Sequence, residues 1–256
     1  MIKVIFFDID GTLLSHASGI VPKSAREAIK KLQENGIKCV CATGRSLLEI
    51  EELVVNDIPF DSYITLNGQV VFDGNRNFLF GNPIQNEEKQ MIIDLFNNKV
   101  TPVMMIEKDD IYMNFVNDYV IKAQHDVSTP VFPVKEYKGN DFYMVSVYVD
   151  SEHEELFRTN FNHCLVTRWH DLGLDIVSKE GGKVAGIEKY IKMNNISLEE
   201  TMALGDGEND IAMLEYVNVG IAMGNAKDKV KEIADYVTDD IDDDGVYKAL
   251  KHFELV

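Results

Sequence analysis

Residues 3–12 read KVIFFDIDGT, an almost wholly apolar run that leads directly into a polar turn. Such a short apolar run suits a strand that is buried on both faces of a parallel sheet. Ligands of open α/β sheets bind beyond the carboxyl ends of the strands, so Asp8 and Asp10 are expected at a binding edge. This stretch therefore predicts the fold class and the place where the chemistry is carried out.

The segments outward from this stretch alternate between helix and strand. A helix opens at Pro22 and stops at Asn35-Gly36, and Ser46 is a suitable N-cap for a second helix. Buried strands are expected at 37–42 and 62–66. The end of the chain alternates in the same way, with expected segments at 184–193, 201–204, 210–215, 217–222, 226–233, 236–238 and 246–253. This pattern predicts an α/β fold with a doubly wound, Rossmann-like parallel sheet.

The middle of the chain follows a different pattern. A helix is expected to begin at Asn86, where Glu87 and Glu88 suit the first turn. Further segments are expected at 102–106, 111–115, 142–149, 152–161, 164–169 and 173–178. We therefore predict a discontinuous core domain formed by 1–82 and 183–256, with an inserted α+β cap domain at 83–182.

The composition excludes several classes of partner. The chain has 256 residues with 25 Lys and Arg against 43 Asp and Glu, a formal net charge of −18. Nucleic acids and anionic membranes both require basic patches, so neither is an expected partner. The sequence leaves the oligomeric state open.

The apolar runs and the cysteines indicate a reducing location. The first apolar run stops at Asp8, which is too short for a signal peptide, and no run approaches the roughly 20 apolar residues of a membrane span. Cys39, Cys41 and Cys164 are too few for a disulfide framework, and no second pair completes a zinc site. Buried thiols in a cytoplasmic protein are the expected interpretation.

Polar residues follow several predicted strands at the same edge of the sheet, and they suit phosphoryl transfer. Asp8 and Asp10 stand two residues apart, and one of these carboxylates could attack phosphorus while the other protonates the leaving oxygen and then activates water. Asp8 and Asp206 could share Mg²⁺, which accepts a few carboxylates and keeps water and phosphate as further ligands. The Thr43 hydroxyl and Lys183, at a helix start, could hold phosphoryl oxygens.

Each of these motifs is weak by itself, but their combination resembles the haloacid dehalogenase-like hydrolases, and within them the Cof-type phosphatases. The resemblance covers nearly all of the predicted core. The residues that carry it are Asp8-Ile9-Asp10-Gly11-Thr12-Leu13-Leu14, Thr43-Gly44-Arg45, Asn67-Gly68, Lys183, Gly205-Asp206-Gly207-Glu208-Asn209-Asp210 and Met223-Gly224-Asn225-Ala226.

The resemblance implies a role for each site residue. Asp8 would be the nucleophile, Asp10 the general acid and base, and the metal ligands would be Asp8, Asp206 and the backbone carbonyl of Asp10. Phosphate would be contacted by Ile9 (through its backbone), Thr43, Gly44, Lys183 and Asn209. Supporting roles, at the metal, at Lys183 or on the substrate side, would fall to Asp210, Glu208, Arg45 and Asn67.

The leading hypothesis is a Mg²⁺-dependent phosphatase that acts on small phosphorylated metabolites, with sugar phosphates as the favoured class. Two alternatives stay open. A phosphomutase would use the same aspartyl-phosphate but return the phosphoryl group to an intermediate. A non-enzymatic sensor of phosphorylated ligands would use the same sheet edge without turnover, although no motif residue is missing.

Two further groups of residues are candidates for a binding site. Arg168, Trp169 and His170 could face the substrate or be ordinary cap surface. The acidic run at 239–244 could bind calcium, but it lacks the ligand spacing and bidentate Glu of a known loop. A solvated turn into the last helix is the expected structure there.

Overall fold

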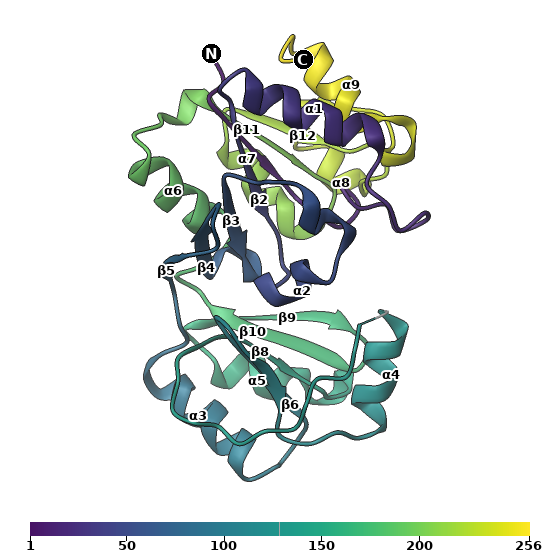
Figure 1. Ribbon diagram of the computed structural model, residues 1–256. Coiled ribbons are helices and arrows are strands. Elements are labelled where there is room, and N and C mark those ends of the chain that lie inside the picture. Colours follow the sequence, from purple (N-terminus) through teal and green to yellow (C-terminus); the bar gives the residue numbers. More distant parts are fainter. Residues whose placement is uncertain (128) are drawn as a thin grey trace. The chain divides into compact units, whose positions relative to one another are not determined.

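The computed structural model describes residues 1–127 and 129–256, which form two compact units (Figure 1). Unit 1 contains Met1–Phe80 and Gly182–Val256, and unit 2 contains Gly81–Gly181. The parallel sheet of unit 1, with helices on both of its faces, confirms the predicted α/β fold class. Within the described residues, no helix is both long enough and apolar enough to cross a membrane.

Unit 1 is built on an eight-stranded sheet with the order β13-β12-β11-β1-β2-β3-β4-β5. Six of its strands run parallel along the sheet: β1 (Val4–Phe7), β2 (Lys38–Ala42), β3 (Ser62–Thr65), β11 (Thr201–Gly205), β12 (Val219–Ala222) and β13 (Tyr236–Val237). In the centre, Phe7 pairs with both Cys41 and Leu204. The loops that follow β1, β2 and β11 therefore leave the sheet side by side.

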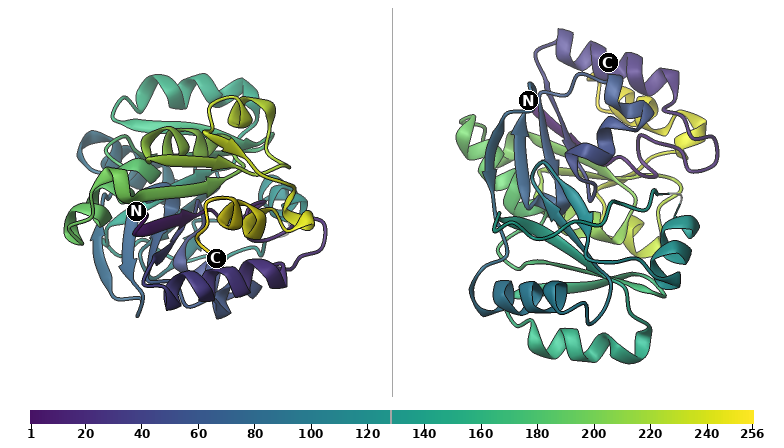
Figure 2. Two further views of the ribbon diagram at one scale, coloured as in Figure 1. Left: turned by 90° about the horizontal axis from the view of Figure 1, so that it is seen from above. Right: turned by 60° about the horizontal axis from the view of Figure 1, so that its bottom comes forward.

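Helices cover both faces of this sheet because the apolar residues of β1 alternate between the faces. Val4 and Phe6 pack in one cluster with Ile187 of α6 and Leu214 of α7. On the other face, the thiol of Cys39 lies against the backbone of α1. The helices of unit 1 are α1 (Lys23–Glu34), α2 (Leu47–Glu51), α6 (Lys183–Met193), α7 (Ile211–Tyr216), α8 (Asp228–Lys231) and α9 (Gly245–His252). The purple α1 and the yellow α9 pack against each other (Figure 2).

Most predicted segments of unit 1 agree with the structure to within a few residues. Ser46 caps α2 as predicted, because its hydroxyl accepts from the backbone N–H of Glu49 while the Glu49 carboxylate returns to Ser46 N–H. Two strands were not predicted, β4 (Val70–Asp73), which runs antiparallel to β3, and β5 (Phe78–Gly81). The residues of β5 are partly or largely exposed, so this strand lacks the buried apolar run by which the other strands were predicted.

Unit 2 is built on an antiparallel sheet with the order β7-β6-β8-β10-β9. Its strands are β6 (Val103–Glu107), β7 (Ile111–Met113), β8 (Phe142–Val147), β9 (Cys164–His170) and β10 (Gly173–Ser178). Its helices are α3 (Asn86–Asn97), α4 (Asp118–Asp126) and α5 (Glu154–Asn160). Residues of α3 and α5 share one apolar cluster with the sheet, and Figure 2 shows these two helices on the same side of it.

Helix α4 was not predicted from the sequence. It is short, its N-cap is Asn117, and it buries only Val120, Ala123 and Gln124. Gln124 donates to the hydroxyl of Tyr148 at 2.7 Å. A polar residue at a buried helical position hides the apolar periodicity by which a helix is predicted. The side chain of Gln124 is therefore buried against a partner, Tyr148, that lies elsewhere in unit 2.

Candidate active site

Asp8 occupies the first position after β1, in the middle of the unit 1 sheet. Its backbone N–H donates to the carbonyl of Leu204 at 3.1 Å, which continues the pairing of β1 with β11. Its side chain is only 7% exposed. Sheet pairing thus fixes a nearly buried carboxylate at the carboxyl end of the central strand.

The ammonium of Lys183 is the counter-ion of this carboxylate. Lys183 is the first residue of α6, and its Nζ donates to Asp8 Oδ1 at 2.6 Å and to Asp210 Oδ1 at 2.5 Å. The Lys183 side chain is 1% exposed, and that of Asp210 is fully buried. Buried charges of this kind are tolerated only when they are paired and hydrogen-bonded, as they are here.

The loop after β11 holds the other two acidic groups. The second oxygen of Asp210 accepts from the backbone N–H groups of Asp206 at 3.0 Å and Gly207 at 2.9 Å. Asp206 Oδ1 accepts from the Thr12 hydroxyl at 2.9 Å. A Cβ on Gly11, which has φ +83°, would lie 2.2 Å from Asp206 Oδ2, so the loop after β1 can approach this carboxylate only with glycine there.

Asp8, Asp206 and Asp210 form an acidic cluster whose ligand oxygens all lie within 4.8 Å of one another. Three carboxylates and the single ammonium of Lys183 leave two negative charges, which a hard divalent cation would balance. Carboxylate oxygens are the ligands that such cations prefer. The acidic cluster is therefore suited in charge, donor type and spacing to hold one.

Burial shifts the pKa values of Asp8, Asp206 and Lys183. Burial, reinforced by Asp210, raises the pKa of Asp8 well above its ordinary range, although Lys183 opposes the shift. Burial also raises the pKa of Asp206 to about 6, against the lowering effect of the Thr12 hydroxyl. Burial lowers the pKa of Lys183, but the carboxylates of Asp210 and Asp8 outweigh burial and raise it overall. A bound cation would favour both carboxylates as anions.

Asp10 and Arg45 form a bidentate ion pair beside the acidic cluster. Arg45 Nε donates to Asp10 Oδ2 at 2.7 Å and Nη2 donates to Oδ1 at 2.8 Å. The hydrogen bonds to Asp10 are the main reason why the pKa of Arg45 is raised. Thr43 is buried, and its hydroxyl oxygen accepts from the backbone N–H of Arg45 at 3.1 Å. The loop after β2 thus orients the carboxylate that follows β1.

The remaining predicted residues meet around the loop after β3. Asn209 Nδ2 donates to Asn67 Oδ1 at 3.2 Å, and the backbone N–H of Asn67 donates to the Thr43 carbonyl at 2.9 Å. A Cβ on Gly44 would lie 3.2 Å from Asn67 Oδ1. Ile9 is fully buried between Asp8 and Asp10, and its carbonyl accepts backbone N–H groups of the following turn.

The carboxylate of Glu208 forms ion pairs with residues outside the candidate site. It pairs with Lys227 at 3.0 Å and with Lys229, and half of its side chain is exposed. These lysines lower the pKa of Glu208. The structure does not bring Glu208 to Lys183, whose acidic partners are Asp8 and Asp210.

Two residues that the sequence analysis left without a role complete the site. Thr12 binds Asp206, as described above. Asn225 donates from Nδ2 to the Gly11 carbonyl at 2.7 Å, and its Oδ1 accepts from the Ile241 N–H at 3.1 Å. Both residues belong to motifs that carry the family resemblance, but their contacts are seen only in the folded chain.

The other candidate residues contact neighbouring parts of their own unit. Arg168 donates to Glu154 and to four backbone carbonyls of unit 2, so its guanidinium is occupied. Trp169 packs edge-on against Tyr148. The acidic run at 239–244 forms the predicted turn into α9. The three thiols are free and buried, as predicted for Cys39 and Cys41, and burial raises the pKa of each.

Comparison with known proteins shows which protein family this chain belongs to. Residues 5–250 match the family model of haloacid dehalogenase-like hydrolases. The chain is 31% identical to 5-amino-6-(5-phospho-D-ribitylamino)uracil phosphatase YcsE of Bacillus subtilis (strain 168), over 99% of this chain and 96% of that protein.

Solved structures of the same superfamily share the whole fold. Phosphatase BT1666 from Bacteroides thetaiotaomicron matches with a TM-score of 0.90 and 33% identity, covering 100% of this chain and 96% of that one. The subclass IIB sugar phosphatase BT4131 matches with a TM-score of 0.84 and 34% identity, covering 99% and 100% of the two chains. This chain therefore belongs to the haloacid dehalogenase-like hydrolases and is an enzyme of their phosphatase branch.

Proposed function

We propose that the enzyme is a Mg²⁺-dependent phosphatase that hydrolyses small sugar phosphates through an aspartyl-phosphate intermediate. The observation that carries the proposal is the pairing of Lys183 with Asp8 and Asp210 beside Asp206, all at the carboxyl edge of the central strands. The substrate class is supported by the sugar phosphatase BT4131 and by the ribityl phosphate in the name of YcsE.

Asp8, Asp206 and the backbone carbonyl of Asp10 would hold Mg²⁺ in this proposal. The ion would neutralise phosphate charge and orient the phosphoryl group towards Asp8. Asp210 has a different role, because Lys183 and two backbone N–H groups already occupy its oxygens. It positions Lys183 and the loop that carries Asp206.

The chemistry proceeds in two displacements. A carboxylate oxygen of Asp8 attacks phosphorus, the bond to the leaving oxygen breaks, and Asp10 gives that oxygen its proton. Asp10 then removes a proton from water, and the water oxygen attacks phosphorus of the aspartyl-phosphate. Inorganic phosphate leaves and the Asp8 carboxylate is restored. Arg45 binds both oxygens of Asp10 in this structure, so in this proposal Asp10 leaves the ion pair before it donates its proton.

The phosphoryl oxygens would be bound by groups that surround Asp8. The Thr43 hydroxyl accepts from Arg45 N–H and so keeps its own hydrogen for a phosphoryl oxygen. Lys183 supplies positive charge, and the backbone at Ile9 and Gly44 and the amide of Asn209 supply further donors. Asn67 holds Asn209 in place. We propose that the segment 83–182 is the cap domain that selects the rest of the substrate.

The deciding experiment measures phosphate release from a panel of phosphorylated sugars, nucleotides and cofactors, with Mg²⁺ or with chelator. Asp8→Asn should lower turnover on the order of 10³-fold or more while the fold is kept, because the nucleophile is lost. Asp228→Asn is the matched control, since this exposed acid of α8 lies outside the site.

Two results would contradict the proposal. Full activity of Asp8→Asn would exclude the covalent intermediate, and release that is unaffected by chelator would exclude the metal. Transfer of phosphate between positions of a sugar without release of inorganic phosphate would indicate a phosphomutase instead.

A further inference from the structure

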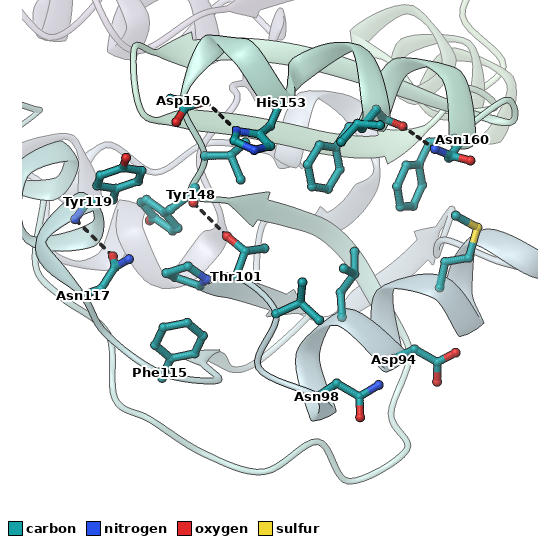
Figure 3. Close-up of a pocket in the computed structure, with 18 residues that line it drawn as sticks. Asp94, Asn98, Thr101, Phe115, Asn117, Tyr119, Tyr148, Asp150, His153 and Asn160 are labelled. Atoms are coloured by element: carbon teal, nitrogen blue, oxygen red, sulfur yellow. Dashed lines mark hydrogen bonds and ion pairs between the residues drawn. The ribbon is translucent and has the colours of Figure 1, made fainter.

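Unit 2 contains a cavity of about 740 Å³ on the side of its sheet that carries α3 and α5 (Figure 3). Small-molecule sites typically have volumes of about 300–1,000 Å³ and mostly apolar walls with a few polar groups. All of the lining residues lie between Met91 and Phe161, so the cavity belongs to unit 2 alone. None of them belongs to the proposed catalytic machinery.

The wall of the cavity is largely aromatic and aliphatic. Its aromatic side chains are Phe115, Tyr119, Tyr148, Phe157 and Phe161. Val100 and Leu156 also line it, and they are 69% and 60% exposed. Apolar side chains that remain this open around a cavity are a common mark of a ligand site.

The charged groups of the lining carry one sign. Asp150 and His153 lie along one wall and Asp94 along the other (Figure 3). His153 Nδ1 donates to Asp150 Oδ1 at 2.6 Å, and this hydrogen bond lowers the pKa of Asp150, which is therefore an anion at neutral pH. Among the described residues, no Lys or Arg lines the cavity. An anionic ligand would meet two carboxylates here, in a chain whose net charge is already −18.

We propose that this cavity binds a small organic cation that has an aromatic or aliphatic body, such as an arylalkyl ammonium. The body would occupy the apolar wall near Phe157 and Phe161, and the ammonium would be attracted by Asp150 and Asp94. Aromatic faces also attract cations, so the two features of the wall select the same ligand. The ligand class is opposite in charge to the phosphorylated substrate of the proposed active site.

The test compares three probes that differ only in their head group: phenylpropylammonium, phenylpropanol and phenylpropanoate. Titration calorimetry on the full chain gives the dissociation constant of each. We expect the ammonium to bind at least about fivefold more tightly than the alcohol, as an exposed ion pair with a cation–π contact allows. The carboxylate should bind more weakly than the alcohol because two like charges repel it.

Two sets of variants locate the binding. Leu156→Lys places a positive charge and a longer side chain at the cavity, and should abolish binding of the ammonium. Ile121→Lys is the matched control, because Ile121 is a 53% exposed apolar residue of α4 outside the lining. The double variant Asp94→Asn with Asp150→Asn should bring the ammonium and the alcohol to within about twofold of each other. Thermal melting and phosphate release should stay at wild-type level in all of these variants.

Three results would overturn the proposal. One is the absence of binding by all probes, and another is equal binding by all three. The third is binding that survives Leu156→Lys. Sedimentation identifies the competing occupant, because a dimer that Leu156→Lys dissociates would assign this face to a second copy of the chain. Since phosphate release is measured separately, failure here leaves the proposed function untouched.

Discussion

Asp8 of unit 1 and Glu107 of unit 2 are both buried acids, but they have different kinds of partner. In unit 1, Asp8 and Asp210 share the ammonium of Lys183, and Asp206 Oδ1 accepts a hydrogen bond from the Thr12 hydroxyl. In unit 2, Glu107 is buried with neutral donors, the Tyr112 hydroxyl at 2.6 Å on one oxygen and an amide at 2.8 Å on the other.

The difference lies in whether the chain itself balances the buried charge. The buried carboxylate of Glu107 has a hydrogen-bond donor on each oxygen and needs nothing more from outside the chain. The acidic cluster of unit 1 keeps an excess of two negative charges, and burial, reinforced by the charge of Asp210, raises the pKa values of Asp8 and Asp206. Perturbed groups of this kind gather at functional sites, where a cation or substrate completes the charge balance.

The largest expected effect comes from removing the shared counter-ion. Lys183→Met leaves Asp8 and Asp210 buried without a positive partner, which should cost about 3–5 kcal/mol of unfolding free energy and abolish phosphate release. Denaturant unfolding of the metal-free protein measures the loss. Lys229→Met, at an exposed lysine that pairs with Glu208, is the control and should change stability by less than about 1 kcal/mol. Similar costs for the two variants would mean that the buried charges are not coupled.

A glycine pair tests how closely the loop after β1 must approach the acidic cluster. Gly11→Ala should lower turnover on the order of 100-fold, because the new Cβ would lie 2.2 Å from Asp206 Oδ2 and displace it. Gly19 has φ +68°, and no atom would lie within 4 Å of a Cβ there. Gly19→Ala therefore introduces the backbone strain without the crowding. Turnover and melting temperature are measured for both. Equal turnover would show that backbone strain, not crowding, governs this loop.

The pH dependence of stability sharpens the comparison further. The pKa of Asp206 is about 6 in the folded chain against an ordinary 3.8, so the folded state binds this proton more tightly than the unfolded state. Between about pH 4 and pH 6 this group therefore makes the protein less stable as pH rises, and the full penalty applies above pH 6.

Asp206→Asn removes this penalty. After solvent screening is allowed for, the metal-free variant should be about 1–2 kcal/mol more stable than the metal-free wild type at pH 8. The difference should disappear below about pH 4. Thermal unfolding across this range measures it, and added Mg²⁺ should reverse the order at pH 8 by stabilising only the wild type. A variant that is less stable at pH 8 without metal would contradict the account of the acidic cluster.

The smallest effect is expected in unit 2. Tyr112→Phe removes one donor from Glu107, whose other oxygen keeps its bond to Asn140. The cost should be about 1 kcal/mol, with phosphate release unchanged. Denaturant unfolding and a turnover assay check both parts. A loss as large as that of Lys183→Met would remove the distinction between the two units.

The sequence by itself predicted the fold class, and it predicted that most of the candidate site residues lie at one edge of the sheet. The apolar run before Asp8 predicts a buried parallel strand, and in a parallel sheet the loops after the strands emerge at one edge. Asp8, Thr43, Asn67 and Asp206 could therefore be assigned to a common place without coordinates. The helix start at Lys183 could also be predicted, because Gly181-Gly182 precedes a segment with apolar residues at helical spacing.

Only the tertiary structure decided which side chains are partners. Glu208 and Asp210 stand two residues apart in one loop, yet Asp210 binds Lys183 and Glu208 binds Lys227 and Lys229. The bidentate bond of Arg45 to Asp10, the bond of Thr12 to Asp206, the strands β4 and β5 and the helix α4 were likewise invisible in the sequence. Periodicity and motif order specify which residues reach an edge of the sheet, whereas pairing depends on distances of a few ångströms between segments far apart in the chain.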